Sequence, residues 1–380
     1  MKRVIIAPDS FKESMTAVQA ANKIKEGFTR VFPELETVLV PMSDGGEGFT
    51  ETMAAATGGR IHKCMATGPL GAPVEACYGL LGDGKTAVLE MATAAGLALV
   101  PPEKRNPLFT TTYGVGELIL HAVDAGAAVV IVGIGGSSTN DGGAGMAQAL
   151  GAKLLTEDGR EIERGAAGLQ KLHRIDTGDF RIDLNKVKVL IAADVDNPLC
   201  GPRGASYVYA KQKGATPDMI PVLDQALFHY AGIVERDLGV DIKEIPGAGA
   251  AGGLGGGMAA FLDAEIKSGV EIALEMVKME ELLKKDVDLV ITGEGQINRQ
   301  TVYGKVPVGV ARLAKKYQVP VIALVGSVGE GAEEVLNNGI DAYFSIVPRP
   351  LTLKEALEEG GAFLADQAEQ VARVLRLKGM

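Results

Sequence analysis

The sequence contains no tryptophan, and aromatic residues make up only 5% of its 380 residues. It therefore offers few of the stacking surfaces on which proteins bind single-stranded nucleic acid. The net charge is −10 and the basic residues form no stripe, so we expect no duplex nucleic acid partner. The three cysteines, Cys64, Cys77 and Cys200, form no close pair. Their spacing excludes a disulfide framework and a cysteine-based zinc site, and it suits a reducing, cytoplasmic location.

Long apolar runs are also missing. No stretch of 18 apolar residues occurs, so we expect no membrane span, and the apolar run near the N-terminus stops at Asp9, too early for a signal peptide. Glycine, in contrast, is abundant, with 50 residues, or nearly twice the average share of about 7%. The glycines have no period and alternate with aliphatic residues, which excludes collagen and disorder. The chain length predicts two domains.

The two ends of the chain show the alternation of strands and helices that is typical of an α/β domain. Short apolar runs predict five buried strands, and amphipathic segments between them predict helices. The expected strands are Arg3–Pro8, Thr37–Pro41, Asp288–Thr292, Pro320–Val325 and Ala342–Ile346. They predict one doubly wound parallel sheet built from residues 1–60 and 285–380, and if its strand order is the flavodoxin-like 2-1-3-4-5, the first strand lies beside the third. The pairing of Arg3–Pro8 with Asp288–Thr292 is the most specific part of this prediction.

The middle of the chain, residues 61–284, has a different pattern. Three strand-like runs follow one another with turn signals and no helix between them, and later strands alternate with helical stretches. The early runs are His62–Ala66, Val74–Leu81 and Thr86–Glu90. This pattern predicts a mixed α+β domain inserted between the two parts of the first domain.

Polar, glycine-rich segments follow the strands of the first domain. Because the carboxyl ends of parallel strands lie at one edge of a sheet, a ligand site is expected there. The candidate residues are Ser10 and Lys12 after the first strand, Asp44, Gly45 and Gly46 after the second, and Glu294 after the third. Lys12 and Lys305 each precede a helix and suit an anion. The structural alternative is that these residues only cap helices and form turns.

Two glycine-rich segments of the middle region favour phosphate binding. The first is a run of small residues that can donate hydrogen bonds, placed between a strand and a helix. It predicts a phosphate-binding loop, although it is not a Walker A sequence. The candidate residues are Gly135, Gly136, Ser137, Ser138, Thr139 and Asn140. The second, Gly247–Gly252, has the spacing G-x-G-x-x-G but no good strand before it, so a Rossmann site is not expected. Backbone contacts to phosphate from Gly252, Gly253 and Gly255 remain a prediction, and a purely structural loop is the alternative in both places.

Two carboxylates, Asp194 and Asp196, follow the expected strand Val187–Ala192. Alternation places them on one face of an extended segment, where they suit Mg²⁺ or a proton transfer from a substrate hydroxyl. Arg203 follows closely and can clamp a carboxylate or a phosphate. A turn before Pro198 is the structural alternative.

These motifs together resemble the bacterial glycerate kinases. The segments that carry the resemblance are Pro8–Ser14, Ser43–Gly48, Gly136–Gly143, Asp194–Leu199 and Gly293–Gly295, in order along nearly the whole chain. The resemblance implies ATP-dependent phosphorylation of D-glycerate to 2-phosphoglycerate, less often 3-phosphoglycerate, with Mg²⁺. It also implies a restriction-enzyme-like topology for the inserted domain and a site in the interdomain cleft. One departure is Asn298, where the family usually has Asp.

For such a kinase, Asp194 is the expected base toward the attacking hydroxyl, with Lys12 and Asn298 as further catalytic residues. Asp196 and Asp44 are the expected metal ligands, and the other candidate residues hold glycerate or nucleotide. The expected partners are small molecules, with neither nucleic acid nor membrane, and the protein is expected to be a cytoplasmic monomer or homodimer. An NAD-dependent hydroxy-acid dehydrogenase and a non-catalytic glycerate-binding sensor are the alternatives, and the domain that holds ATP stays open.

Overall fold

The computed structural model describes residues 1–377, which form two units. The first unit comprises residues 1–44, 51–58 and 270 onward, and the second comprises residues 45–50 and 59–269. The boundary therefore differs from the expected one, because residues 270–284 belong with the first unit and Gly45–Thr50 with the second. Within residues 1–377, no helix is long and apolar enough to cross a membrane.

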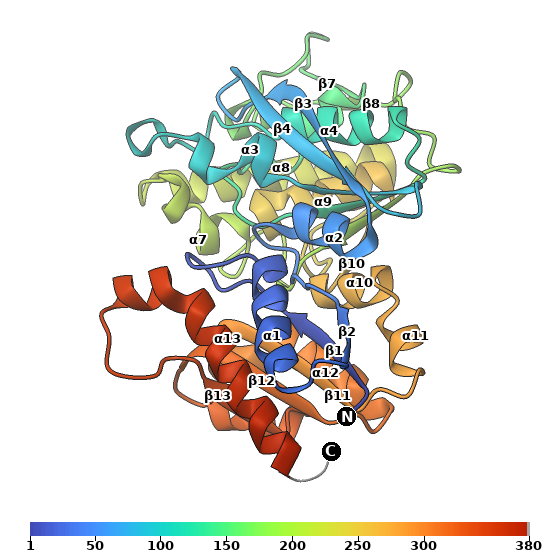
Figure 1. Cartoon of the computed structure of the whole chain (residues 1–380). Coiled ribbons are helices and arrows are strands. Elements are labelled where there is room, and N and C mark those ends of the chain that lie inside the picture. The colour runs from blue at the N-terminus through green and yellow to red at the C-terminus, as the bar shows by residue number, and fades with distance from the viewer. Residues whose placement is uncertain (378–380) are drawn as a thin grey trace. The chain divides into compact units, whose positions relative to one another are not determined.

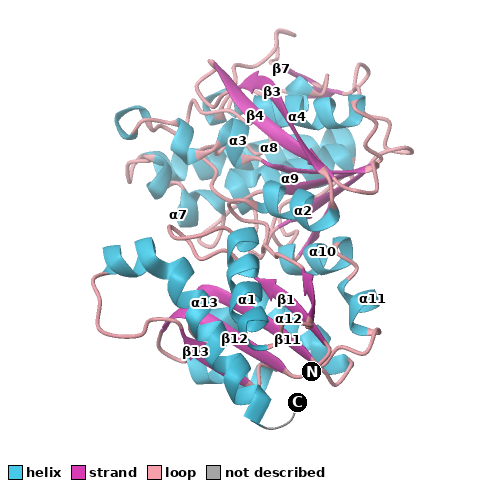
Figure 2. Ribbon diagram, viewed as in Figure 1, coloured by secondary structure: helices cyan, strands magenta, loops and turns pink. Residues whose placement is uncertain are grey.

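A five-stranded sheet forms the centre of the first unit (Figure 2). The order is β2-β1-β11-β12-β13 and all neighbouring strands are parallel, with Val4 opposite Leu289 in the β1–β11 pair. This confirms the predicted strand order and the pairing of strands nearly 300 residues apart. The strands are β1 (Arg3–Pro8), β2 (Glu36–Leu39), β11 (Leu289–Ile297), β12 (Val321–Val328) and β13 (Ala342–Ser345).

Helices cover this sheet because its strands carry apolar side chains on both faces. One face of the sheet is covered by α1 and α13, whose apolar residues form a buried cluster with Val4, Ile6 and Ile291. On the other face, Ile5 is equally buried, and α12 packs against β1 and β11. The elements outside the sheet are α1 (Ala17–Val31), α2 (Phe49–Thr57), α10 (Gly269–Met276), α11 (Met279–Leu283), α12 (Val306–Lys316), α13 (Leu353–Leu377) and the 3₁₀ turns η4 (Arg299–Val302) and η5 (Ala332–Asn338). The segment between β12 and β13 is thus a 3₁₀ helix and not an α-helix.

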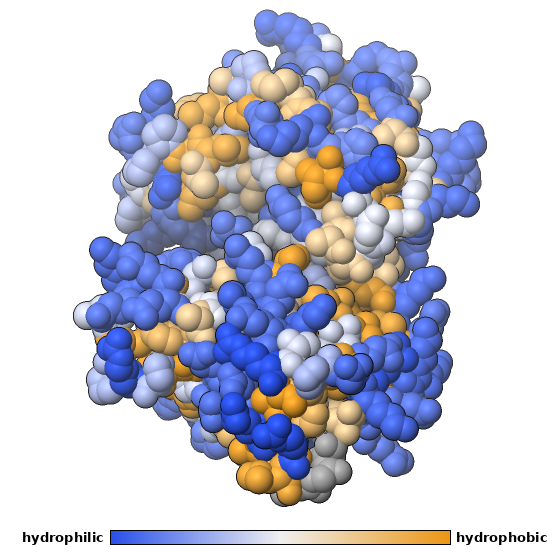
Figure 3. All heavy atoms as spheres, in the orientation of Figure 1, coloured by the Kyte–Doolittle hydropathy of each residue, from blue (hydrophilic) through white to orange (hydrophobic). Residues whose placement is uncertain are grey.

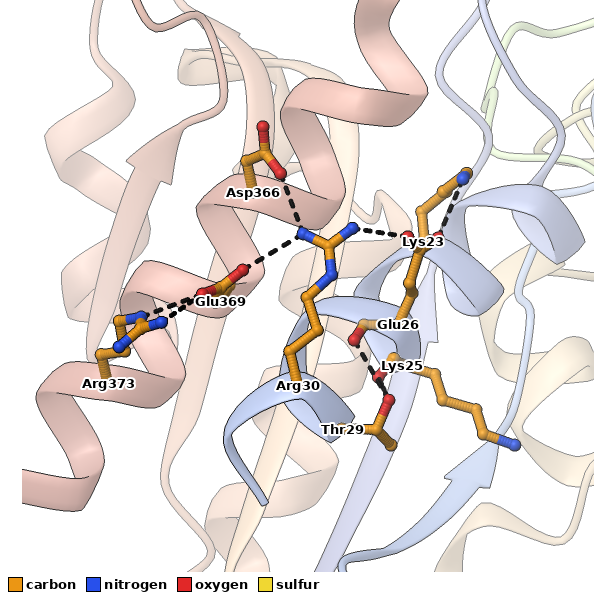
Figure 4. Close-up of polar contacts among 8 residues, drawn as sticks. All are labelled: Lys23, Lys25, Glu26, Thr29, Arg30, Asp366, Glu369 and Arg373. Atoms are coloured by element: carbon orange, nitrogen blue, oxygen red, sulfur yellow. Dashed lines mark hydrogen bonds and ion pairs between the residues drawn. The ribbon is translucent and has the colours of Figure 1, made fainter. Parts of the chain in front are cut away.

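The first and last helices of the chain, α1 and α13, lie side by side (Figure 1). Arg30 of α1 donates to Asp366 at 2.9 Å and to Glu369 at 3.1 Å, both on α13, and Arg373 also binds Glu369 (Figure 4). The face that carries α1 is largely hydrophilic (Figure 3). These exposed ion pairs join the two ends of the chain, but exposed pairs typically add little stability. The apolar contacts beneath them therefore hold the two helices together.

The second unit is built around a six-stranded mixed sheet with the order β10-β9-β6-β5-β4-β3. The strands β3, β4 and β5 are antiparallel neighbours, and the remaining pairs are parallel. Its strands are β3 (Arg60–Thr67), β4 (Pro73–Leu80), β5 (Thr86–Glu90), β6 (Val129–Gly133), β9 (Lys188–Ala192) and β10 (Glu265–Lys267), and a separate pair is β7 (Lys153–Leu155) with β8 (Arg174–Asp176). The antiparallel start and the later mixture with helices agree with the predicted mixed character.

Helices of the second unit bury one large apolar cluster against this sheet. They are α3 (Ala92–Ala95), α4 (Tyr113–Asp124), α5 (Ala144–Ala149), α6 (Ala166–Leu169), α7 (Ala205–Tyr209), α8 (Met219–Leu238) and α9 (Ala250–Leu262), with the 3₁₀ turns η1 (Leu97–Leu99), η2 (Pro102–Lys104) and η3 (Lys211–Lys213). The loops that leave β6 and β9 at their carboxyl ends carry most of the polar candidate residues of this unit.

Candidate active site

The polar residues of the first unit gather where β1, β2 and β11 end. The Asp9 main-chain N–H donates to the Gly293 carbonyl oxygen at 2.9 Å, which ties the end of β1 to β11. An added Cβ on Gly295 would lie 3.5 Å from the Lys12 main-chain nitrogen, so the segment after β1 runs close past the end of β11. Ser10, Lys12 and Glu294 thus lie at one edge of this sheet, as the strand order requires.

Asp9 is the most strongly perturbed group at this edge, although the sequence motifs did not single it out. Burial raises the pKa of its carboxyl most, the negative charges of Asp44 and Glu294 add to the rise, and the Ser10 main-chain N–H and Lys12 oppose it, so that the resulting pKa is about 7. A carboxyl that titrates near neutrality is typical of functional sites. The sequence signal was available, because Asp9 directly follows a buried strand.

Glu294 is a buried carboxylate with two side-chain partners. Only 5% of the residue is exposed, and it accepts hydrogen bonds from the Thr301 hydroxyl at 2.6 Å and from Lys305 Nζ at 3.4 Å. Burial raises the Glu294 pKa, whereas these two partners lower it. Lys305 begins α12, so its ammonium group lies near both a helix N-terminus and a carboxylate. The first unit therefore brings carboxylates and ammonium groups together at one sheet edge.

Asn298 lies just beyond β11 and caps the 3₁₀ turn η4. Its Oδ1 accepts from the Gln300 main-chain N–H at 2.8 Å, and its main-chain N–H donates to the Thr301 hydroxyl at 3.1 Å. Its Nδ2 donates to Gln296 Oε1 at 3.3 Å. The side chain is thus engaged in a local capping box, a structural role that Asp fills as well as Asn.

Among residues 1–377, no group of three or more His, Cys, Asp or Glu side chains is arranged to hold a metal ion by itself. Mg²⁺ in phosphoryl-transfer enzymes commonly takes one or two protein carboxylates and completes its shell with water and substrate phosphates. The carboxyl groups of Asp9 and Glu294 interact electrostatically with Asp44, and this set of oxygen donors suits a cation in this way.

The second unit brings Gly45 and Gly46 to the ends of β6 and β9. A Cβ added to Gly133 would lie 2.7 Å from the Gly45 carbonyl oxygen, and one added to Gly45 would lie 3.0 Å from the Ala192 side chain. Gly135 faces Gly46, with 3.8 Å between its added Cβ and the Gly46 Cα. Glycines that are far apart in sequence thus meet at one sheet edge, and a side chain at Gly133 or Gly45 would clash there, whereas Gly135 only contacts Gly46.

The loop after β6 is exposed at its start and buried beyond it. Gly135 and Gly136 are exposed, whereas Ser137 to Asn140 are buried. The Ser138 hydroxyl donates to the Ala95 carbonyl oxygen at 2.9 Å, and its own carbonyl oxygen accepts from the Thr110 hydroxyl at 2.8 Å. The expected donors to phosphate therefore fall into two groups, of which Gly135 and Gly136 are open to solvent.

The predicted phosphate contacts at Gly252, Gly253 and Gly255 are buried in the structure. An added Cβ on Gly252 would lie 1.9 Å from the Thr139 carbonyl oxygen, and one on Gly253 would lie 2.9 Å from the Gly142 Cα. Gly255 approaches the Gly247 carbonyl oxygen in the same way. Close packing, against the loop after β6 for Gly252 and Gly253 and against the segment before α9 for Gly255, already explains why these positions need glycine. No strand lies between β9 and Gly247 in the described chain, and this agrees with the expected absence of a Rossmann site.

The carboxyl end of β9 carries the exposed residues Asp194, Asp196 and Arg203. Asp194 Oδ1 accepts from the Gly269 main-chain N–H at 3.2 Å. The segment is held by Asn197, whose Nδ2 donates to the Arg203 carbonyl oxygen at 2.8 Å and whose Oδ1 accepts from the Tyr209 hydroxyl at 2.6 Å. Both acidic groups and the guanidinium are thus presented on one braced loop.

Two further features of the second unit were not predicted from the sequence. The buried Glu90 accepts main-chain hydrogen bonds from Gly48 at 3.2 Å and Thr50 at 2.8 Å, and so fixes the start of α2.

The other feature is Gly79–Thr86, which fits the P-loop spacing G-x-x-x-x-G-K-T. The structure makes it the turn between the antiparallel strands β4 and β5, where Asp83 binds the Thr86 hydroxyl and Lys85 is exposed. Without a following helix it is not a phosphate-binding P-loop.

A doubly wound parallel sheet with polar side chains at the carboxyl ends of its strands is the arrangement of enzymes that act on small molecules. The family model "Glycerate kinase family" matches residues 4–376. The chain is 54% identical to a glycerate kinase of Halalkalibacterium halodurans over 98% of both chains. It is 49% identical to the glycerate 2-kinase of Escherichia coli, over 99% of this chain and 98% of that one.

A crystal structure of a glycerate kinase homologue from Salmonella typhimurium LT2 has the same fold. The TM-score is 0.92 at 47% identity, and the match covers 100% of this chain and 99% of that one. The chain belongs to the glycerate kinase family and is an enzyme. Its substrates are therefore small molecules.

Proposed function

We propose that the enzyme transfers the γ-phosphoryl group of ATP to the 2-hydroxyl of D-glycerate. The substrate oxygen forms a bond to the γ-phosphorus while the bond from that phosphorus to the β,γ-bridging oxygen breaks. The products are 2-phosphoglycerate and ADP, and the hydroxyl proton passes to a carboxylate of the enzyme. Membership of the glycerate kinase family over residues 4–376 is the observation that carries this proposal. The charged sheet edge and the glycine-rich loops supply the chemistry.

The first unit suits the acceptor. Glycerate carries a carboxylate and two hydroxyls, which match ammonium donors and acidic acceptors respectively. Lys12 and Lys305 bind the substrate carboxylate, Ser10 hydrogen-bonds to it, and Asp44 accepts from a hydroxyl. Glu294 holds the Lys305 ammonium in place through their 3.4 Å contact. Positioning of this kind is the main protein contribution to phosphoryl transfer.

The second unit suits the phosphates. Gly135 and Gly136 offer exposed main-chain N–H groups at the end of β6, and Arg203 supplies a guanidinium on the same loop as the exposed Asp194. Asp194 takes the proton of the attacking hydroxyl, because an exposed carboxylate on a braced loop can reach a substrate. Asp9, whose pKa lies at about 7, is the second candidate base, since a pKa near the working pH favours proton transfer.

Magnesium accompanies ATP in this proposal. Asp44 and Asp196 are the side chains that would hold it, and when bound it neutralises charge on the phosphoryl oxygens. The carboxyl groups of Asp9 and Glu294, which interact electrostatically with Asp44, support the first assignment. For Asp196 the support is its exposed position after β9.

An ADP-release assay coupled to NADH oxidation, run over a panel of small hydroxy acids, tests the proposal. We expect turnover with D-glycerate that depends on Mg²⁺, and 2-phosphoglycerate as the product identified by ³¹P NMR. Formation of 3-phosphoglycerate would correct the regiochemistry alone. Tight D-glycerate binding without ADP release would instead identify a sensor, and thermal protection by NADH but not by MgATP would favour a dehydrogenase.

A further inference from the structure

Lys213 is a fully buried lysine that belongs to none of the sequence motifs. Only 1% of it is exposed, and its Nζ donates to the Thr139 carbonyl oxygen at 2.7 Å, 74 residues away in sequence. Lys213 ends the 3₁₀ turn η3, and Gly214 follows with φ of 94°. A Cβ on Gly214 would lie 2.3 Å from the Arg105 carbonyl oxygen. This tight turn fixes the direction in which the lysine enters the core.

A buried carboxylate lies on the same loop as Thr139. Asp141 is fully buried and accepts from the Thr112 main-chain N–H at 2.8 Å, from the Thr112 hydroxyl at 2.9 Å and from the Gly143 main-chain N–H at 3.2 Å. Burial lowers the Lys213 pKa to about 7, and the charge of Asp141 opposes that change. The loop after β6 is therefore held both by a buried amine and by a buried carboxylate.

Some other buried polar atoms near this loop make no hydrogen bond. Thr139 Oγ1 and Asn140 Oδ1 are buried without a hydrogen-bond partner, and so is the hydroxyl of Tyr230, whose ring packs on Gly142. Burying a lysine costs more free energy than burying an apolar side chain of similar size. Its retention here is best explained by the one carbonyl group that it holds.

We propose that Lys213 is a positioning residue for the loop that starts at Gly135 and Gly136. By holding the Thr139 carbonyl inward, its ammonium group fixes the backbone direction of the preceding residues, whose N–H groups then face the phosphates. This inference rests on the proposed assignment of nucleotide to that loop. It predicts a loop that is already ordered in the free enzyme.

The test is Lys213→Met, which keeps the length of the side chain and removes its charge and donor. Tyr230→Phe is the matched control, because it removes an unpartnered hydroxyl from the same buried region. We expect Lys213→Met to raise the Kd for MgADP, by titration calorimetry, and the KM for ATP about tenfold, the scale of one lost charge-assisted hydrogen bond. The KM for D-glycerate should stay within about twofold, and Tyr230→Phe should match the wild type.

Each outcome decides between the two proposals. Equal MgADP affinity in Lys213→Met and the wild type would overturn the role of Lys213 alone, as would an equal rise in both KM values. A wild-type enzyme that does not bind MgADP would overturn the nucleotide assignment as well. If Lys213→Met does not fold, amide hydrogen exchange of the free wild type decides. Slow exchange at Ser138, Gly142 and Gly143 is expected, and rapid exchange there would refute a preordered loop.

Discussion

The two units present different chemistry at the carboxyl ends of their sheets. In the first unit, the groups at this edge are ionisable side chains. Asp9 is partly buried, Glu294 is buried, and Lys305 Nζ lies 3.4 Å from the Glu294 carboxylate. In the second, exposed glycines offer main-chain groups, while the ionisable Asp141 and Lys213 are buried. The first arrangement suits a small anion with hydroxyls, and the second suits phosphate oxygens. Substitutions in the two units should therefore differ in their pH dependence and in the substrate whose KM they change.

The largest effect is expected for Asp194→Asn. Loss of a general base typically lowers the rate by about 10²–10⁴, and the isosteric amide should leave KM values nearly unchanged. The measurement is steady-state kinetics with both substrates varied. Asp196→Asn serves as the matched variant from the same loop, and it should change the Mg²⁺ dependence more than kcat. A near-normal kcat in Asp194→Asn would move the role of base to Asp9, and so to the first unit.

Asp9→Asn should make the protein more stable at neutral and alkaline pH. The carboxyl pKa is about 7 in the folded protein against an ordinary value of 3.8, so the wild type loses stability as the pH rises from about 4 to about 7. One pKa unit corresponds to about 1.4 kcal/mol, which predicts a gain of roughly 2–4 kcal/mol for the variant at pH 8. Denaturant unfolding at several pH values measures it.

The difference between Asp9→Asn and the wild type should vanish near pH 4, where the folded wild type holds the proton and the unfolded chain begins to take it up. A stability difference that is the same at pH 4 and pH 8 would show that the charge of Asp9 is not its cause. The corresponding substitution of an exposed carboxylate, Glu75→Gln, should show no such pH dependence.

Glu90→Gln should destabilise the second unit by about 1–3 kcal/mol, because a charged acceptor of two main-chain N–H groups is replaced by a neutral one. The Gly48 and Thr50 amides that it binds lie at the start of α2. Unfolding by urea measures the change, and Glu75→Gln is again the control. Equal stability of Glu90→Gln and the wild type would mean that water or another group replaces the carboxylate without cost.

Much of the architecture could be predicted from the sequence, because buried parallel strands are continuous apolar runs. The pairing of β1 with β11 followed from strand count and chain topology. The place of Asp9 after a buried strand is visible in the sequence, but its raised pKa is not, because that shift comes from burial and from the charges of Asp44 and Glu294, which reach it only in the folded sheet. For the same reason Lys213 resembles an ordinary surface residue in the sequence. The Walker-like spacing at Gly79–Thr86 shows the reverse case, where a motif lacks the strand–loop–helix context that gives it meaning.

Asn298→Asp is expected to have the smallest effect. Asp keeps the Oδ1 acceptor for the Gln300 main-chain N–H and loses the Nδ2 donor to Gln296 Oε1. Caps of either type are similar in stability, so the unfolding midpoint should hardly move. Kinetics with titrated Mg²⁺ separate the two roles of this residue. A rise in kcat or in Mg²⁺ affinity would place Asn298 in the catalytic machinery, and unchanged kinetics would leave it a cap.

The assignment of the acceptor to the first unit and of the nucleotide to the second is tested most directly by amide hydrogen exchange of the wild type with each ligand alone. With MgADP, we expect protection of the segment around Gly135 and Gly136 and little change at the ends of β1 and β11. With D-glycerate, we expect protection around Ser10 and Lys12 and in the turn before α12. Protection of the first unit by MgADP and of the glycine-rich loop by D-glycerate would contradict the assignment of the acceptor to the first unit and of the nucleotide to the second.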